Sequence, residues 1–149
     1  ISKKSRDNSR TPMQWDDSTN AGFSNETPWL GVNGNYKNIN VAKALEDQNS
    51  VYYYYKKLIS LRKNEELISE GSYKPILEYH PSIFAYMREY ENQKLINFNN
   101  FYGKEVELSL IEIIPDIKDY EYLLGNYGEV DIEEKIKLRA YESVAFIKR

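Results

Sequence analysis

The chain of 149 residues is long enough for one domain, or for a small domain with a large appendage. Its net charge of -3 is spread over interspersed acidic and basic residues without a clustered basic patch, so we expect no nucleic-acid partner. The mean hydropathy is -0.70, and no apolar run approaches the roughly 20 residues that cross a bilayer, so we expect no membrane partner.

The chain contains no cysteine, which excludes disulfide bonds, thiolate metal sites and cysteine nucleophiles. This composition fits the reducing cytoplasm, which is the expected location. The first six residues contain neither an initiating Met nor the apolar segment of a signal peptide, so we expect a truncated part of a longer protein.

Residues 1–48 are rich in small polar residues and have no sustained periodicity, apart from a short predicted helix over residues 40–46 with Asn40 as its N-cap. Both tryptophans lie in this region, and a solvated linker has no reason to contain them. Asp16 and Asp17 are predicted to form a turn or a cap. The pattern predicts a long ordered loop that packs on another surface.

The clearest helix is predicted over residues 50–63. Its apolar side chains follow the spacing of one buried helical face, and Lys and Arg residues cluster toward its end, where they favour the helix dipole. Asn49 or Ser50 is expected to cap its start.

Beyond residue 64 the pattern changes to the alternation of half-buried strands, interrupted by turn signals. About seven strands at this spacing predict an antiparallel sandwich or open barrel. The predicted strands cover residues 73–79, 83–90, 94–101, 106–110, 120–124, 136–140 and 143–147.

Few residues offer catalytic chemistry. His80 is the only histidine, so every Ser-His-Asp or multi-histidine metal scheme depends on it, and its position before Pro81 indicates an exposed turn residue. Carboxylates are plentiful, but the sequence nominates no facing pair. The seven glycines are scattered and form no phosphate loop. We therefore predict no catalytic residue, no metal ligand and no cofactor in this chain.

Residues 5–16 read Ser-Arg-Asp-Asn-Ser-Arg-Thr-Pro-Met-Gln-Trp-Asp, which combines two guanidinium groups with carboxylate, amide and indole groups in one loop. Such groups suit a polyhydroxylated ligand, because guanidinium donates to hydroxyls in fixed geometry and indole offers an apolar face. On composition alone, solvated surface charge is the stronger interpretation.

This segment closely resembles the Arg-Asp-Asn-Ala-Arg-Thr-Pro-Met-Gln-Trp-Asp motif of glycoside hydrolase family 13 α-glucosidases, in the group of oligo-1,6-glucosidases and trehalose-6-phosphate hydrolases. Ser9 replaces the alanine of that motif. The resemblance continues in the family's order to the end of the chain, through residues 20–23, 28–29, 35–41, 53–59, 81–86 and 138–142.

The resemblance implies a mainly β fold: an antiparallel Greek-key β domain of sandwich type, preceded by the last helix and a long loop of a (β/α)8 barrel. Residues 1–64 would form the end of the barrel, with the loop on its active-site side. Residues 65–149 would form the β domain. The missing barrel would then be the partner in cis on which the loop packs.

The resemblance also implies an enzyme that hydrolyses α-glucosidic bonds of short oligosaccharides with retention. Its Asp nucleophile, Glu acid/base and transition-state-stabilising Asp would lie before residue 1, so the fragment alone is expected to be inactive. Arg6 matches the arginine that hydrogen-bonds the non-reducing glucose, and it is the predicted substrate-binding residue. Asp7, Arg10 and Trp15 are expected to hold the loop in shape.

Three alternatives remain open. The parent could be a trehalose-6-phosphate hydrolase, the β domain could be a carbohydrate-binding module, or the parent could be a non-catalytic relative. Two departures from the family pattern carry structural expectations: Asn97 needs a hydrogen-bond partner and suggests an edge strand, and Ala140 in place of a common proline loosens one strand entry.

Overall fold

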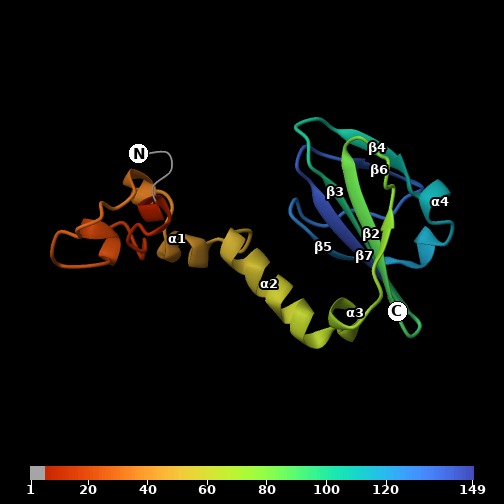
Figure 1. The fold of residues 1–149 in the computed structure, drawn as a ribbon, viewed down its shortest axis with the longest axis horizontal. Coiled ribbons are helices and arrows are strands. Elements are labelled where there is room, and N and C mark those ends of the chain that lie inside the picture. The colour runs from red at the N-terminus through yellow and green to blue at the C-terminus, as the bar shows by residue number, and fades with distance from the viewer. Residues whose placement is uncertain (1–5) are drawn as a thin grey trace. The chain divides into compact units, whose positions relative to one another are not determined.

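The computed structural model describes residues 6–149, except for the side chains of Arg6 and Asn8. The chain divides into two compact units, Ile1–Leu58 and Ile59–Arg149, and Figure 1 shows the elements of each. Within the described residues, no helix combines the length and the apolar character needed to cross a bilayer.

The first unit consists mainly of loop, interrupted by short helical turns. The predicted helix is present as α1 (Val41–Glu46), and Asn40 caps it through Oδ1, which accepts a hydrogen bond of 2.9 Å from the Lys43 amide. Both parts of that prediction are confirmed. The remaining turns are η1 (Arg6–Ser9), η2 (Thr19–Gly22) and η3 (Gly34–Lys37).

Helix α2 (Val51–Asn64) lies within one residue of its predicted bounds. The prediction that one face of this helix is buried is wrong, because none of its residues is buried and Val51 and Tyr55 are largely exposed. Helical spacing tells which side chains share a face, but burial also requires a neighbouring surface to pack on.

The second unit is built on a five-stranded antiparallel sheet in the order β1-β2-β3-β7-β5, and β4 pairs with β6 in a separate two-stranded sheet. Strand β7 lies between β3 and β5, as in the predicted Greek-key arrangement. The strands are β1 (Lys74–Ile76), β2 (Ile83–Tyr90), β3 (Gln93–Asn100), β4 (Val106–Ser109), β5 (Glu121–Gly125), β6 (Lys135–Leu138) and β7 (Ser143–Lys148). Short helical segments are α3 (Glu66–Ser69), α4 (Leu110–Ile113) and η4 (Ile117–Asp119).

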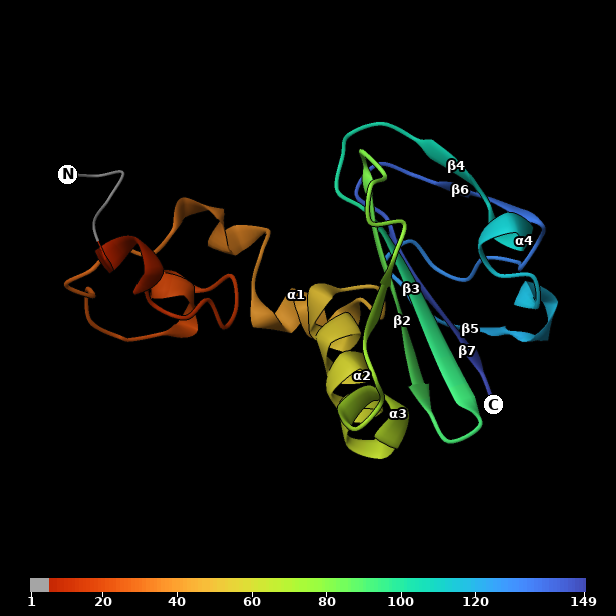
Figure 2. The same ribbon diagram turned by 45° about the vertical axis from the view of Figure 1, so that its right-hand side comes forward.

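The core lies between one face of the large sheet and the β4–β6 pair, which gives the sandwich-like arrangement seen in Figure 2. Phe98 of β3 and Phe146 of β7 are fully buried, with ring centroids 6.4 Å apart. Leu108 of β4 and Leu138 of β6 close the core from the other side. The opposite face of the sheet carries a smaller cluster, formed by the buried side chains of Leu67, Leu95 and Ile147.

Four details of the strand predictions are wrong. Asn97 lies on the central strand β3 rather than an edge, although its need for a partner is confirmed, because its Nδ2 donates to the Val144 carbonyl at 3.2 Å. The first strand is shorter than predicted because Leu77 turns the backbone with a φ of 57°. Leu110 begins α4, and β6 ends at Leu138 before the turn toward β7.

Candidate functional site

The segment that follows Arg6 is shaped by a left-handed turn. Asn20, Ala21 and Gly22 have φ values of 53°, 58° and 65°. The carbonyl of Ala21 accepts hydrogen bonds from the amides of Trp15 (2.9 Å) and Asp16 (3.3 Å). Left-handed conformations strain residues other than glycine, so they persist where surrounding contacts hold them. This turn therefore fixes the backbone of Trp15 and Asp16.

The side chain of Asp16 occupies the space beside this turn. Its Oδ1 accepts hydrogen bonds from the Ser18 hydroxyl (2.5 Å) and the Ser18 amide (2.9 Å), and these bonds lower the pKa of the carboxyl group. A Cβ added to Gly22 would lie 2.7 Å from Asp16 Oδ2. Glycine at position 22 therefore adopts this φ without strain and leaves room for the Asp16 carboxylate. The prediction that Asp16 forms a turn is confirmed.

The amide side chains of Gln14 and Asn40 connect other parts of the loop by hydrogen bonds. Gln14 Nε2 donates to Asn35 Oδ1 at 3.1 Å and to the Ile39 carbonyl, and the Gln14 carbonyl accepts from the Val41 amide at 2.9 Å. Asn40 is buried, and its Nδ2 donates to the Tyr36 carbonyl at 2.8 Å while its Oδ1 caps α1. Backbone and amide hydrogen bonds therefore join residues 14–15 to the start of α1.

Asn20 extends the same network, since its Nδ2 donates to the carbonyls of Ser24 (3.0 Å) and Glu26 (3.1 Å). The sequence reasoning did not identify Gln14 or Asn20 as positioning residues. The signal for Asn20 was available, because Asn-Ala-Gly combines residues that tolerate left-handed backbone with an adjacent glycine. Gln14 gave no such signal.

The backbone of Arg6 begins η1, and the Arg10 amide donates to the Asp7 carbonyl at 3.0 Å. The Arg10 side chain is exposed, and the Trp15 indole is half exposed. The side chain of the predicted substrate-binding residue, Arg6, lies outside the described part of the structure, so its role stays a prediction. The structure does show that hydrogen bonds fix the backbone of the loop that follows Arg6.

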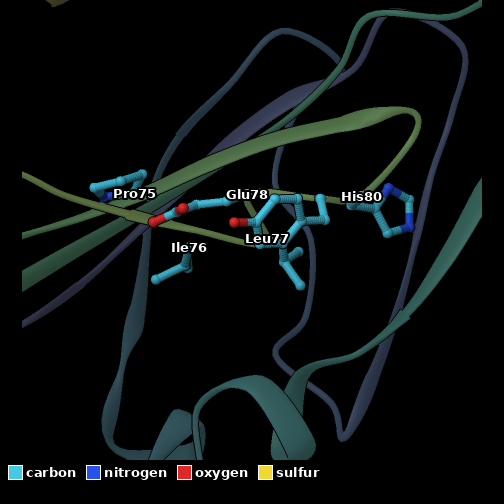
Figure 3. Close-up of a pocket in the computed structure, with 6 residues that line it drawn as sticks. Pro75, Ile76, Leu77, Glu78 and His80 are labelled. Carbon is cyan, nitrogen blue, oxygen red and sulfur yellow. The ribbon is translucent and has the colours of Figure 1, made fainter.

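His80 has a structural role in the second unit. Its Nδ1 accepts hydrogen bonds from the amides of Ser82 (3.2 Å) and Ile83 (3.0 Å), which fixes the turn into β2, and its ring is half buried rather than exposed. Figure 3 shows His80 at the end of a surface hollow lined by residues 75–80. One consecutive segment lines this hollow, whereas ligand sites gather polar groups from several elements.

In the second unit, the carboxyl groups with shifted pKa values belong to structural ion pairs. Asp116 accepts a hydrogen bond of 2.8 Å from Lys148, which lowers its carboxyl pKa. Burial opposes ionisation of Glu142, but hydrogen bonds from the Arg139 side chain and amide outweigh it and lower the pKa. A general acid requires a raised pKa, so neither group suits that role. Among residues 6–149, no cluster of three or more His, Asp or Glu side chains is arranged to hold a metal ion.

Comparisons with known families divide the chain similarly. Residues 1–71 match the α-amylase catalytic domain, and residues 83–145 match the α-amylase SusG C-terminal domain. The chain therefore belongs to the α-amylase family of glycoside hydrolases, represented here by the end of a catalytic domain and a β domain.

Within this family the chain is similar to oligo-1,6-glucosidases and trehalose-6-phosphate hydrolases. It is 50% identical over 147 residues to the oligo-1,6-glucosidase of Bacillus cereus, with 96% of this chain and 26% of the relative covered. It is 47% identical over 147 residues to the trehalose-6-phosphate hydrolase of Bacillus subtilis, with 98% and 26% covered. The solved trehalose-6-phosphate hydrolase of Bacillus licheniformis, mutant R201Q, superposes with a TM-score of 0.87 at 43% identity, with 98% of this chain and 27% of that chain covered. The chain thus spans about a quarter of the length of these relatives.

Proposed function

We propose that the chain is the C-terminal portion of a cytoplasmic α-glucosidase of the oligo-1,6-glucosidase type, which hydrolyses α-glucosidic bonds of short oligosaccharides with retention. The observation that carries the proposal is the 50% identity to the Bacillus cereus oligo-1,6-glucosidase, which extends over 96% of this chain and includes both units. The absence of cysteine fits the proposed compartment.

In this proposal residues 1–64 complete a (β/α)8 barrel and residues 65–149 form a domain that braces it. The match to the α-amylase catalytic domain over residues 1–71 supports this division. So does the exposure of large apolar side chains in the first unit, such as Trp29 at 88% and Ile39 at 65%, because such residues ordinarily pack on a neighbouring surface. The catalytic carboxylates would come from the preceding barrel strands, and the chain alone would be inactive.

The proposed role of Arg6 is to hydrogen-bond the non-reducing glucose bound next to the cleaved bond. A guanidinium group donates in a fixed fork that suits neighbouring hydroxyls. The hydrogen bonds from Trp15 and Asp16 to Ala21, and from Val41 to Gln14, support this role by fixing the loop that follows. A positioned arginine can favour one orientation of the sugar ring.

A second candidate function is hydrolysis of trehalose 6-phosphate. The observation that favours it is the 47% identity to the Bacillus subtilis trehalose-6-phosphate hydrolase, together with the TM-score of 0.87 to the solved Bacillus licheniformis enzyme. Trehalose 6-phosphate has an α,α-1,1 linkage and a phosphate group, whereas isomaltose has an α-1,6 linkage and no phosphate, so a comparison of their hydrolysis rates separates the candidates.

The test uses the full-length polypeptide, assayed with isomaltose, trehalose 6-phosphate and a chromogenic α-glucoside. We expect isomaltose cleavage with the α-anomer of glucose as the first product by proton NMR, and no cleavage by the 149-residue chain. Preference for trehalose 6-phosphate would select the second candidate, and an inactive full-length polypeptide would contradict both.

Arg6→Ala tests the substrate-binding role, with Lys137→Ala as the control because that cationic side chain is exposed on β6 of the second unit. Loss of charge-assisted hydrogen bonds should lower kcat/KM of the full-length polypeptide by about 100-fold in the first variant. The second variant should remain within about twofold of the parent, since exposed charges contribute little. Equal effects of the two substitutions would contradict the assignment.

A further inference from the structure

In the first unit, an asparagine directly precedes a glycine at the start of the turn η3. Asn33 is the N-cap of this turn, and its Oδ1 accepts a hydrogen bond of 3.3 Å from the Asn35 amide. Asn33 and Gly34 are both exposed, and apart from the adjacent residues no described atom lies within 4 Å of the position that a Cβ would take on Gly34. Asparagine is a thermally labile residue, and a following glycine places no side chain beside its amide. This pair is therefore open to chemical modification.

The Gly34 amide differs from the amides that follow other asparagines of this unit. Between residues 20 and 50, hydrogen bonds of 2.9 to 3.2 Å are donated by the amides of Ala21, Glu26, Tyr36, Ile39, Val41 and Ser50, each of which follows an asparagine. Within residues 6–149, the Gly34 N–H has no such acceptor. An amide without an acceptor gives up its proton to solvent base more readily than one held by a carbonyl. The Gly34 nitrogen is therefore available as a nucleophile.

The reaction available to this pair is deamidation through a cyclic imide. The deprotonated Gly34 nitrogen attacks Asn33 Cγ, the new N–C bond closes a succinimide ring, and the side-chain nitrogen leaves as ammonia. The attack is intramolecular, so the reacting groups are already adjacent. Water then adds to one imide carbonyl and reopens the ring. Opening at the backbone carbonyl gives isoaspartate, opening at the side-chain carbonyl gives aspartate, and nothing is oxidised or reduced.

The Asn35 amide assists the first step of this reaction. Negative charge develops on Asn33 Oδ1 when the nitrogen attacks Cγ, and the Asn35 N–H already donates to that oxygen. Donors placed where charge develops lower a barrier in the manner of an oxyanion hole. The same hydrogen bond closes a side-chain turn over the peptide bond between Asn33 and Gly34, which keeps Cγ near the attacking nitrogen.

We propose that Asn33 is a site of spontaneous deamidation, and that its isoaspartate product detaches the turn η3 from Gln14. Isoaspartate adds a methylene group to the backbone and turns the carbonyl that accepts from the Tyr36 amide at 3.2 Å into a free carboxylate. It also moves the oxygen that caps η3 into the backbone. Gln14 Nε2 donates to Asn35 Oδ1 at 3.1 Å, so displacement of Asn35 breaks this contact. The loop that follows Arg6 then loses one of the hydrogen bonds that fix it.

Peptide mapping by mass spectrometry, after prolonged incubation of the 149-residue chain at mildly alkaline pH, tests the site directly. Deamidation replaces NH2 by OH and raises the mass, and electron-transfer fragmentation distinguishes isoaspartate from aspartate. We expect the modification to appear first at Asn33. Gly34→Ala should slow it by about tenfold or more, since a methyl group obstructs closure of the ring. An equal rate in Gly34→Ala, or an intact Asn33 where other asparagines react, would overturn the proposal.

Asn49 is the internal control. It is also exposed and precedes a small residue, but the Ser50 amide donates to the Asp47 carbonyl at 3.0 Å. In the native chain Asn49 should react at least about tenfold more slowly than Asn33. Urea removes the hydrogen bond of the Ser50 amide, so the rate at Asn49 should rise while the rate at Asn33 should not. Equal rises at the two positions would contradict the role of the free Gly34 amide.

Hydrogen exchange of the Val41 amide, which donates to the Gln14 carbonyl at 2.9 Å, reports detachment of the turn. In the isoaspartate fraction this amide should exchange about tenfold faster than in fresh protein, because Gln14 has lost a partner. Freshly prepared Asn33→Asp is the matched control. It adds the charge but keeps the cap, so exchange of Val41 should stay within about twofold of the parent. Unchanged exchange in the isoaspartate fraction, or equal acceleration in Asn33→Asp, would contradict detachment.

In the full-length polypeptide, prolonged incubation should lower kcat/KM for isomaltose in proportion to the isoaspartate fraction, a consequence that rests on the proposed function. Gly34→Ala, incubated alongside and compared with its own starting rate, should keep its activity. An active polypeptide in which Asn33 stays intact would reject the deamidation site alone. An inactive polypeptide that gains isoaspartate at Asn33 would reject the proposed function alone.

Discussion

The two units are held together by different physical means. In the first, a left-handed turn and the side chains of Gln14, Asp16 and Asn40 fix the backbone, while large apolar residues such as Trp29 remain exposed. In the second, the sheet and the β4–β6 pair enclose an apolar core centred on Phe98. Local polar chemistry can define the shape of a loop, but a core supplies most of the stability of a domain. The first unit is thus ordered mainly by local hydrogen bonds, and the second by its apolar core.

The largest expected effect comes from the core of the second unit. Phe98→Ala removes a fully buried ring that packs on Phe146, so the free energy of unfolding should fall by about 3–5 kcal/mol. Trp29→Ala in the first unit is the matched control, and it should change this free energy by less than about 0.5 kcal/mol. Urea unfolding followed by circular dichroism measures both. Comparable losses of unfolding free energy in the two variants would contradict the claim that only the second unit is stabilised by an apolar core.

The next effect concerns the turn between β6 and β7. Glu142 is buried, and its carboxylate accepts hydrogen bonds from the Arg139 amide (2.7 Å) and guanidinium (2.9 Å). Glu142→Ala should lower the free energy of unfolding by about 2–3 kcal/mol, the range for hydrogen bonds to charged groups. Glu134→Ala, which removes an exposed partner of Lys118, should cost at most about 1 kcal/mol.

The same carboxylate predicts a pH dependence. Because the folded-state pKa of Glu142 is lowered, its stabilisation is fully present above the ordinary pKa of 4.5 and is lost as the pH falls through the folded-state value. Acid unfolding of Glu142→Gln should therefore show a smaller loss of stability across this range than the parent. An identical acid profile for the two proteins would rule out this contribution.

A smaller effect is expected in the first unit. Asn40→Ala removes the N-cap of α1 and a hydrogen bond to Tyr36, and should destabilise that helix by about 1 kcal/mol. Hydrogen exchange of the Lys43 amide reports this local opening. Asn25→Ala serves as the control, since Asn25 is exposed. An unchanged exchange rate in Asn40→Ala would show that the cap does not hold the loop.

The smallest effect distinguishes two tyrosines of the second unit. The Tyr120 hydroxyl is buried without a hydrogen-bond partner in the described structure, and burial raises its pKa to about 12. Tyr120→Phe should leave stability unchanged or slightly increased, because no hydrogen bond is lost. Tyr127→Phe should cost about 1 kcal/mol, since that hydroxyl donates to the Ala140 carbonyl at 2.9 Å. Thermal unfolding compares the two variants. A larger loss of stability in Tyr120→Phe than in Tyr127→Phe would contradict the absence of a hydrogen bond at the Tyr120 hydroxyl.

Local patterns in the sequence predicted the local structure well. Alternating apolar residues located all the strands of the second unit, and β2 spans the predicted residues 83–90. Hydrogen-bonding chemistry located the cap at Asn40. These features depend on neighbouring residues, so spacing and side-chain type contain the necessary information.

Features that depend on distant contacts were less accessible. Placing Asn97 on a central strand requires knowing that β7 pairs with β3, which no local pattern reveals. The left-handed backbone of Ala21 is likewise imposed by its hydrogen bonds rather than by alanine itself. At the candidate site, the residues alone favoured solvated charge, and the proposed role of Arg6 came from the resemblance to a family motif.

Native-state hydrogen exchange of the 149-residue chain most directly tests the claim that its second unit is stably folded without further chain and its first unit is not. The account predicts that the central amides of β3 and β7 exchange at least about 1,000-fold more slowly than the hydrogen-bonded amides of Trp15 and Ala42. In the full-length polypeptide, the amides of Trp15 and Ala42 should become protected. Protection of Trp15 and Ala42 equal to that of β3 in the 149-residue chain would contradict the account.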